Sequence, residues 1–168
     1  MKRVSDLEGA AQAIGRIPSG LFIVTTGDLK TGTGYLASFV QQVSLDPMII
    51  TIGVGKSRPA VDMIRASGHF AVHILSEKTK HFVKHFVRGF DQGRPAFTGI
   101  AVEEGVLGTP ILVDSFAVVE CELLSVEAQP GDHVLFFGKA IGGSVRSVDA
   151  STDQDKPVIH VRSSGRKY

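Results

Sequence analysis

Residues 21–40 read Leu-Phe-Ile-Val-Thr-Thr-Gly-Asp-Leu-Lys-Thr-Gly-Thr-Gly-Tyr-Leu-Ala-Ser-Phe-Val, and their pattern sets the expectation for the whole chain. The first five residues, 21–25, are apolar or β-branched, as in a buried strand. Gly27-Asp28 is a turn dipeptide, and an extended pattern resumes over residues 31–40. Two extended runs joined by a tight turn predict a β-hairpin.

Further strand-like runs follow along the chain. Residues 116–126 place Ala117, Val119 and Cys121 on an apolar face and Glu120 on the opposite one, which predicts a half-buried strand. The other predicted strands cover residues 48–54, 69–75, 133–141 and 158–161. Six or seven strands with short helices between them predict a mainly β fold, and they favour a closed or partly closed barrel over a sandwich.

Three short helices are predicted, over residues 5–14, 58–67 and 76–87. Ser5 and Glu8 have the spacing of a capping box at the start of the first helix. Ser57 is the expected N-cap of the second helix, and Gly68 is its expected C′ glycine. Ser76 begins the third. The polar, small residues 142–155 predict an exposed loop.

Length and composition predict a single folded domain. The chain has 168 residues, of which 43% are hydrophobic and 21% charged. We expect a short docking helix in residues 1–16 and a barrel in residues 17–168. The net charge of +1 supplies no basic field for nucleic acid, so a small molecule or another protein is the expected partner.

The cysteine content and the length of the apolar runs indicate in which compartment the protein is expected. Cys121 is the one cysteine, so the sequence allows no internal disulfide, and its place on an apolar strand face predicts buried packing. Residues 47–54 are the longest apolar stretch, far short of the ~20 residues that a membrane helix needs. A cytoplasmic protein that does not enter a membrane is therefore expected.

The histidines do not predict a metal site. His81 and His85 lie four residues apart on a predicted helix, but no Glu follows His81 as it does in zinc proteases. The other four lack a companion Cys or carboxylate at ligand spacing, namely His69, His73, His133 and His160.

Two segments are candidates for ligand binding. Residues 32–39 bring glycines and small residues to a strand, where a flat heterocycle could approach the backbone, although the same glycines could only relieve twist or form a bulge. Lys56, Ser57 and Arg58 place two cations and a hydroxyl at a predicted helix start, which suits a phosphate. The alternative there is an exposed, capped helix with solvated charges.

Several segments together carry a family resemblance. They are IPSGLFIVTT at residues 17–26, LASFVQQVSLDP at 36–47, VGKSR at 54–58, FAVHIL at 70–75, KHF at 84–86, Glu120-Cys121, GDH at 131–133 and VIHVRSSGRKY at 158–168. In number and order they resemble the flavin reductase-like family, and in particular the C-terminal flavin reductase domain of cyanobacterial flavodiiron proteins. Here that domain is expected to stand alone.

The resemblance implies an FMN-binding split barrel, a six-stranded Greek-key barrel that forms a homodimer. It implies a bound FMN, or FAD, and NADH or NADPH as hydride donor. The flavin ring would be lined by Tyr35, Leu36, Ala37, Ser38 and Phe39, with Gln42 and Val43 continuing the same strand. The remaining implied flavin contacts are Gly55, Lys56, Ser57 and Arg58 at the phosphate, together with Phe86, His160 and Tyr168.

His133 is the catalytic residue that the resemblance implies, lying beside the nicotinamide or flavin ring. Read from the residue pattern alone, a lone strand histidine is more often structural. The activity implied is hydride transfer from NAD(P)H to flavin, with electrons passing to free flavin or to a separate acceptor such as a flavin-dependent monooxygenase. An FMN-binding electron-transfer protein with little NAD(P)H activity is the alternative. A more distant one is an oxidase of the pyridoxamine-phosphate type.

Overall fold

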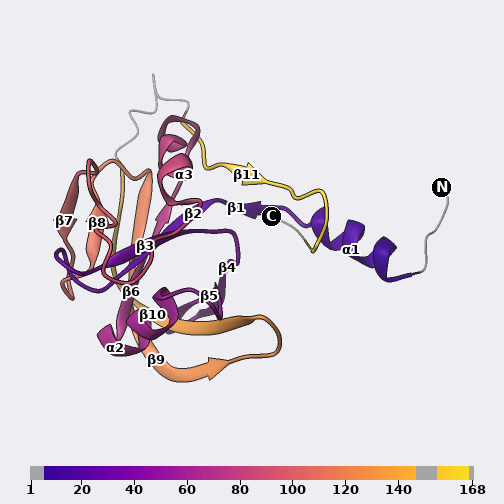
Figure 1. Cartoon of the computed structure of the whole chain (residues 1–168), viewed down its shortest axis with the longest axis horizontal. Helices are drawn as coiled ribbons and strands as arrows, with labels where there is room; N and C mark the ends of the chain where they lie inside the picture. The colour runs from indigo at the N-terminus through magenta and orange to yellow at the C-terminus, as the bar shows by residue number, and fades with distance from the viewer. Residues whose placement is uncertain (1–5, 147–154, 167–168) are drawn as a thin grey trace.

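The structure is a computed structural model that describes residues 6–146 and 155–166. The helices are α1 (Leu7–Gly15), α2 (Ala60–Ser67) and α3 (His81–Phe86), with a 3-10 turn at Glu77–Thr79. The strands are β1 (Ser19–Gly20), β2 (Phe22–Thr26), β3 (Thr33–Ala37), β4 (Val40–Leu45), β5 (Met48–Gly55), β6 (His69–Ile74), β7 (Val102–Glu104), β8 (Pro110–Leu112), β9 (Ala117–Ala128), β10 (His133–Val145) and β11 (Ile159–His160). Figure 1 shows a curled sheet, with α1 standing apart at the end of β1.

The main sheet closes on itself. Its strand order is β3-β2-β6-β9-β10-β5-β4, and every neighbouring pair is antiparallel. A flat sheet would hold its two edge strands about 29 Å apart, whereas only Ser38 and Phe39 join β3 to β4, and that link reaches about 10 Å. The sheet must therefore curl. The Gly53 N–H donates to the Phe39 carbonyl at 2.8 Å across the junction.

The predicted strand over residues 31–40 is wrong at its end, because the chain bends at Ser38. β3 stops at Ala37 and β4 starts at Val40, so one bent strand pairs with β2 through its first half and with β5 through its second. Counted as one, the two halves make the barrel six-stranded. The predicted mainly β fold is confirmed.

Most other strands agree with prediction to within a few residues. The predicted loop over residues 142–155 is wrong at its start, because β10 continues to Val145 against the first residues of β9. Residues 147–154 of that loop lie outside the described part. The short strands β1, β7 and β8 were not predicted, since two or three residues carry too little periodicity to detect.

The helices lie where the sequence predicts them, but their first residues differ from the prediction. Ser5 lies outside the described residues, and Asp6 caps α1 by accepting the Gly9 N–H at 2.7 Å. Ser57 is not the cap of α2, because Pro59 occupies that position. Gly68 does end α2, with a left-handed φ of 74°.

The third predicted helix is interrupted near its start. It divides into the 3-10 turn at Glu77–Thr79 and α3. Ser76 does begin it, with its N–H donating to Thr79 Oγ1 at 2.8 Å. In the described ranges, no helix has the length and apolar character needed to cross a membrane.

Two large apolar clusters and one small one form the core of the described residues. Phe70, Phe136 and Ile52 fill the barrel under α2, and the other large cluster joins Phe86 of α3 to Ile23 of β2. Cys121 belongs to the barrel cluster, and burial raises the pKa of its thiol to about 12. The predicted packing role of this cysteine is confirmed.

His73 is fully buried and bonds to two other strands. Its Nδ1 lies 3.1 Å from the Ile23 carbonyl, and its Nε2 accepts the Leu112 N–H at 3.1 Å. This pattern requires the neutral ring with its proton on Nδ1. Burial lowers the pKa of His73 from 6.5 to about 4.

We expect this histidine to make the fold sensitive to acid. Below its unfolded pKa of 6.5, the unfolded chain binds a proton that the folded chain does not, so the free energy of unfolding falls as the pH drops toward 4. The loss should approach ~3 kcal/mol. Urea unfolding across this pH range, compared with His73→Gln, measures it. If the free energy of unfolding changed with pH in the same way in the wild type and in His73→Gln, the prediction would be contradicted.

Candidate functional site

Three cavities lie in a row along the closure of the sheet. The mouth cavity, about 680 Å³, is lined by Ser38, Phe39 and Leu135 among others. The middle cavity, about 130 Å³, shares Gly53 with it. The arginine cavity, about 300 Å³, shares Tyr35 and Arg58 with the middle one. Because they share lining residues, we refer to the three adjoining cavities together as the groove.

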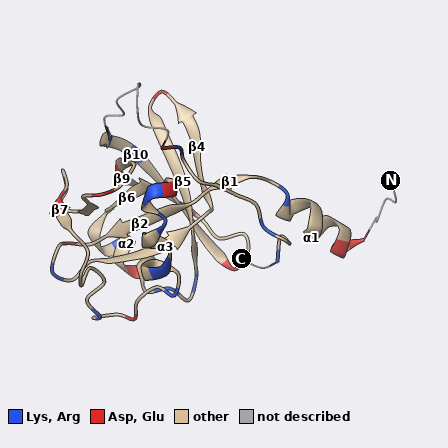
Figure 2. Cartoon of the chain, turned by 90° about the horizontal axis from the view of Figure 1, so that it is seen from above, with Lys and Arg blue, Asp and Glu red and all other residues tan. Residues whose placement is uncertain are grey.

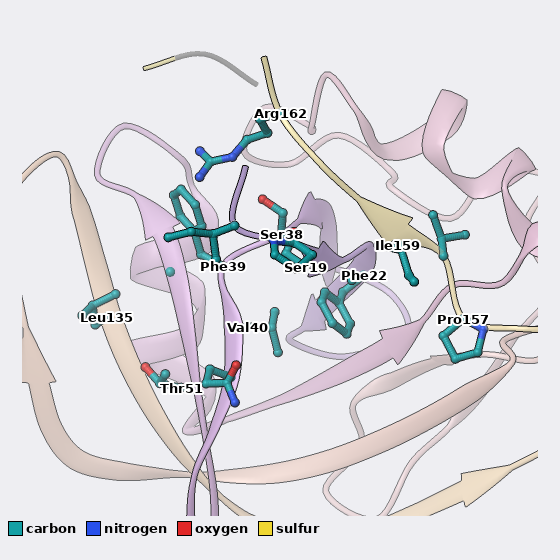
Figure 3. Close-up of a pocket in the computed structure, with 16 residues that line it drawn as sticks. Ser19, Phe22, Ser38, Phe39, Val40, Thr51, Leu135, Pro157, Ile159 and Arg162 are labelled. Atoms are coloured by element: carbon teal, nitrogen blue, oxygen red, sulfur yellow. The ribbon is translucent and has the colours of Figure 1, made fainter. Parts of the chain in front are cut away.

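The mouth cavity is mainly apolar and takes its wall from segments far apart in sequence. Pro157 and Ile159 lie on one side of it, and Phe39 and Leu135 lie on the other (Figure 3). The Arg162 guanidinium carbon lies 5.0 Å from the Phe39 ring centroid. The Ser38 Oγ is buried at this wall and has no hydrogen-bond partner among the described residues, so it is suited to bond a ligand.

His133 lines the middle cavity, and the exposed Asp132 lies beside it. The His133 ring meets Phe39 edge-on, with centroids 5.1 Å apart, and its Nδ1 lies 2.8 Å from Asp132 Oδ1. That hydrogen bond lowers the pKa of Asp132. The Lys56 N–H donates to the Asp132 carbonyl at 3.0 Å, which ties this loop to the segment that follows β5. The histidine ring is therefore held in a defined orientation.

Arg58 is held at the junction of the middle and arginine cavities. Its guanidinium carbon lies 5.5 Å from the Tyr35 ring centroid. On the other side is Gly89, whose φ is 69° and where a Cβ would lie 2.6 Å from Arg58 Nη1. A glycine at this position leaves room for the guanidinium. Charges of both signs are spread over the molecule as a whole (Figure 2), so Arg58 is a local positive charge in the groove and not part of a basic surface.

Many of the predicted site residues do meet in this groove. Six line the middle cavity, namely Tyr35, Leu36, Ala37, Gly55, Arg58 and His133. Ser38 and Phe39 line the mouth cavity, and Ser57 lines the arginine cavity. Lys56 is exposed beside them.

Other predicted site residues lie elsewhere, and their roles stay predictions. Gln42 and Val43 are exposed on β4 and line none of the three cavities. Phe86 is fully buried, with its ring against Gly34, where a Cβ would lie 2.7 Å from it. His160 pairs with Ser19 of β1. Tyr168 lies outside the described residues.

Several lining residues were missed from the sequence, among them Gly53, Arg88, Leu135 and Arg162. Gly53 was detectable, because a glycine inside a buried strand often marks a close approach, and a Cβ there would lie 2.9 Å from the Phe39 Cβ. Arg88, Leu135 and Arg162 carried no local signal.

The groove combines features that suit a flat ring bearing a phosphate. β3 is an edge strand, so half of its backbone N–H and C=O groups face away from β2. Gly55 leaves open space, since a Cβ there would meet only the Arg58 side chain at 4.0 Å. Arg58 supplies a guanidinium, the group that matches phosphate geometry. Among the described residues, no cluster of His, Cys, Asp or Glu could hold a metal ion.

Comparison with known proteins points to one family. A family model described as "Flavin reductase like domain" matches residues 14–167. "Putative diflavin flavoprotein A 1" of Nostoc is 34% identical over 165 residues, which are 98% of this chain and 27% of that protein. The chain thus spans about a quarter of the length of such relatives.

Solved structures agree in fold. Nitrilotriacetate monooxygenase component B from Mycobacterium thermoresistibile superposes with a TM-score of 0.76 at 29% identity, covering 90% of this chain and 80% of that one. The Streptomyces globisporus NADH:FAD oxidoreductase SgcE6 superposes with a TM-score of 0.81 at 24% identity, covering 96% and 94%. The predicted split-barrel fold is confirmed.

Proposed function

Because the chain belongs to the flavin reductase-like family, we propose that it transfers hydride from NADH or NADPH to a flavin held in the groove. The observation that carries the proposal is the middle cavity, where the β3 backbone, Gly55, Arg58 and His133 meet. A bound FMN or FAD would supply the hydride-accepting ring. The protein's part is to bind, orient and keep water away.

The residues fit this task by their positions. Arg58 binds the flavin phosphate, while the free edge of β3 over Tyr35, Leu36 and Ala37 offers backbone donors and acceptors to the ring. The mouth cavity admits the nicotinamide, because its apolar wall displaces water from a flat aromatic ring. His133, oriented by Asp132, would contact the reacting rings as the catalytic residue.

The donor and acceptor classes are also proposals. The name of the Streptomyces protein, NADH:FAD oxidoreductase SgcE6, supports a nicotinamide donor for a protein of this fold. Likewise, the name of the Mycobacterium protein, a component B of a monooxygenase, supports a separate flavin-dependent monooxygenase as acceptor. The reduced flavin, or its electrons, would pass to that partner.

We further propose a homodimer in which a second copy covers the arm formed by α1, β1 and β11. Apolar side chains crowd this arm, where Leu7 is 76% exposed, Ile17 62% and Ile159 78%. The arm stands away from the barrel (Figure 1), and its helix is held by bonds to the C-terminal segment, such as the Gly165 N–H to the Ala11 carbonyl. A nine-residue helix is marginal without further packing.

Stopped-flow mixing tests the hydride transfer. We expect the flavin-loaded protein to lose its flavin absorbance quickly with NADH or with NADPH, because a nicotinamide bound in the mouth cavity would lie beside the ring. Dithionite serves as the control that the bound flavin can be reduced. Bleaching with dithionite but with neither NADH nor NADPH would contradict the reductase proposal and favour an electron-transfer protein.

The phosphate site is tested by removing its cations. The double variant Lys56→Ala/Arg58→Ala should lose about tenfold or more in FMN affinity, since charge-assisted hydrogen bonds are lost. Binding of riboflavin, which has no phosphate, should stay within about twofold. Quenching of flavin fluorescence measures both.

A glycine pair gives a matched control for the same site. Gly89→Ala should also weaken FMN binding, because the new Cβ displaces the Arg58 guanidinium. Gly93→Ala should not, although its φ of 78° carries the same backbone strain, because nothing lies within 4 Å of its Cβ. Equal effects of the two variants would argue against the phosphate assignment.

Sedimentation velocity tests the dimer. We expect a particle of about 36 kDa, twice the 17.9 kDa chain, and a shift to monomer in Leu7→Glu/Ile159→Glu, because burying these charges is costly. Circular dichroism checks that the variant still folds. A wild-type protein that sediments as a monomer at all concentrations would refute the proposal.

A further inference from the structure

A further cavity lies apart from the groove, at the other end of α2. Its volume is about 570 Å³, and its walls include Asp28 and Thr31 of the β2–β3 turn and Met63 and Ser67 of α2. We call it the turn cavity. Among the described residues, it shares none of its lining with the mouth, middle or arginine cavity. Along α2, Ser67 at the turn cavity lies about 10 Å from Ala60, which lines the arginine cavity.

Asp28 gives the turn cavity a fixed negative charge. Its Oδ1 accepts the Thr31 N–H at 2.7 Å, the Lys30 N–H at 2.8 Å and the Thr31 hydroxyl at 3.1 Å. The bonds from these two backbone N–H groups lower the pKa of Asp28, so the carboxylate is ionised at neutral pH. Among the described residues, Oδ2 makes no hydrogen bond and the carboxylate makes no ion pair, which leaves Oδ2 available to a ligand.

The C-terminal end of α2 favours the same sign of ligand charge. Ala66 and Ser67 belong to its last turn and line the turn cavity. The last carbonyls of a helix have no partner within it, and the helix dipole is negative at this end. Arg65 does not cancel this potential, because its guanidinium binds the Glu127 carboxylate at 2.8 and 3.1 Å. Both the helix end and Asp28 therefore favour a cation.

The remaining walls supply a neutral polar group and an apolar surface. His69 lines the turn cavity, and its Nδ1 shares a hydrogen bond with the Thr109 hydroxyl. Burial lowers the pKa of His69, so the ring is neutral at pH 7 and adds no positive charge. Its Nε2 has no hydrogen-bond partner in the described part of the chain. Met63 packs under the turn, with its Cε 3.3 Å from the position of a Cβ on Gly27.

We propose that the turn cavity binds a small organic cation, a primary ammonium group carried on an apolar body such as an aromatic ring. The ammonium donates to Asp28 Oδ2, in a charge-assisted hydrogen bond. The apolar body covers Met63 and Ala66, since the cavity is much larger than an ammonium group alone requires. This site is independent of the proposed hydride transfer, because it lies outside the groove.

Amide proton and nitrogen NMR shifts of the FMN-saturated protein test this inference, with phenethylamine as the probe. Bound FMN keeps the groove filled. We expect saturable shifts at Gly27, Ser67 and Gly93 with a Kd of about 1 mM or lower, and none at Gly53 of the groove. Phenylethanol has the same shape without the charge and should bind about tenfold more weakly. Equal affinities for amine and alcohol would overturn the proposal.

A charge-removing variant locates the cation. Asp28→Asn keeps an oxygen for the N–H groups of Lys30 and Thr31 and should weaken phenethylamine binding about tenfold or more, with phenylethanol within about twofold. Asp62→Asn is the matched control, because Asp62 is an exposed carboxylate of α2 that does not line the turn cavity. It should change neither affinity. Unchanged phenethylamine binding in Asp28→Asn would contradict the assignment.

A lysine side chain of a protein partner carries the same ammonium group, so a second probe separates the two sources. Nα-acetyl-lysinamide should bind about tenfold more weakly than phenethylamine, because its slender chain leaves the apolar wall uncovered. Equal binding would assign the turn cavity to a partner's lysine and overturn the proposal of a small ligand. A protein that binds no flavin overturns the proposed function alone, since the amine titration is then carried out on the ligand-free protein.

Discussion

The two-residue link between β3 and β4 is the constraint on which the rest of the structure depends. Ser38 and Phe39 join the two edge strands of one sheet, so the sheet can only exist curled. The Gly53 N–H secures the bend at the Phe39 carbonyl, and the absent side chain of Gly53 lets the Phe39 ring lie close to β5. The same bend puts Ala37 in the middle cavity and Phe39 at the mouth cavity. The bend that closes the barrel therefore also positions the residues that line the site.

The proposed phosphate site depends on local geometry and not on overall charge. The net charge is +1, and Lys and Arg are interspersed with Asp and Glu (Figure 2). Arg58 becomes effective because Tyr35 and Gly89 hold its guanidinium between them at the junction of two cavities. A fixed guanidinium loses less conformational entropy on binding than a free surface chain, which favours a bound phosphate.

Much of the fold could be predicted because strand patterns are local. The strands over residues 48–54 and 69–75 are predicted correctly, because their apolar runs consist of the residues that the strands bury in the core. The bend at Ser38 could not be read, because Gly53 imposes it from 15 positions away in sequence. Residue type predicts Ser57 as the cap, but the Arg58 N–H donates to the Gly55 carbonyl at 2.9 Å in a turn, and the helix begins only after it. Arg88 and Arg162 reach the groove through tertiary contacts alone, and no spacing rule reveals that.

The central claim is that one groove, continuous from the mouth cavity to Arg58, holds a flavin against the free edge of β3. A crystal structure of the protein with FMN tests it most directly. The account predicts the phosphate within hydrogen-bond distance of Arg58 and the ring against residues 35–39. A ring bound elsewhere, for example in the separate cavity between Asp28 and His69, with the groove vacant, would contradict it.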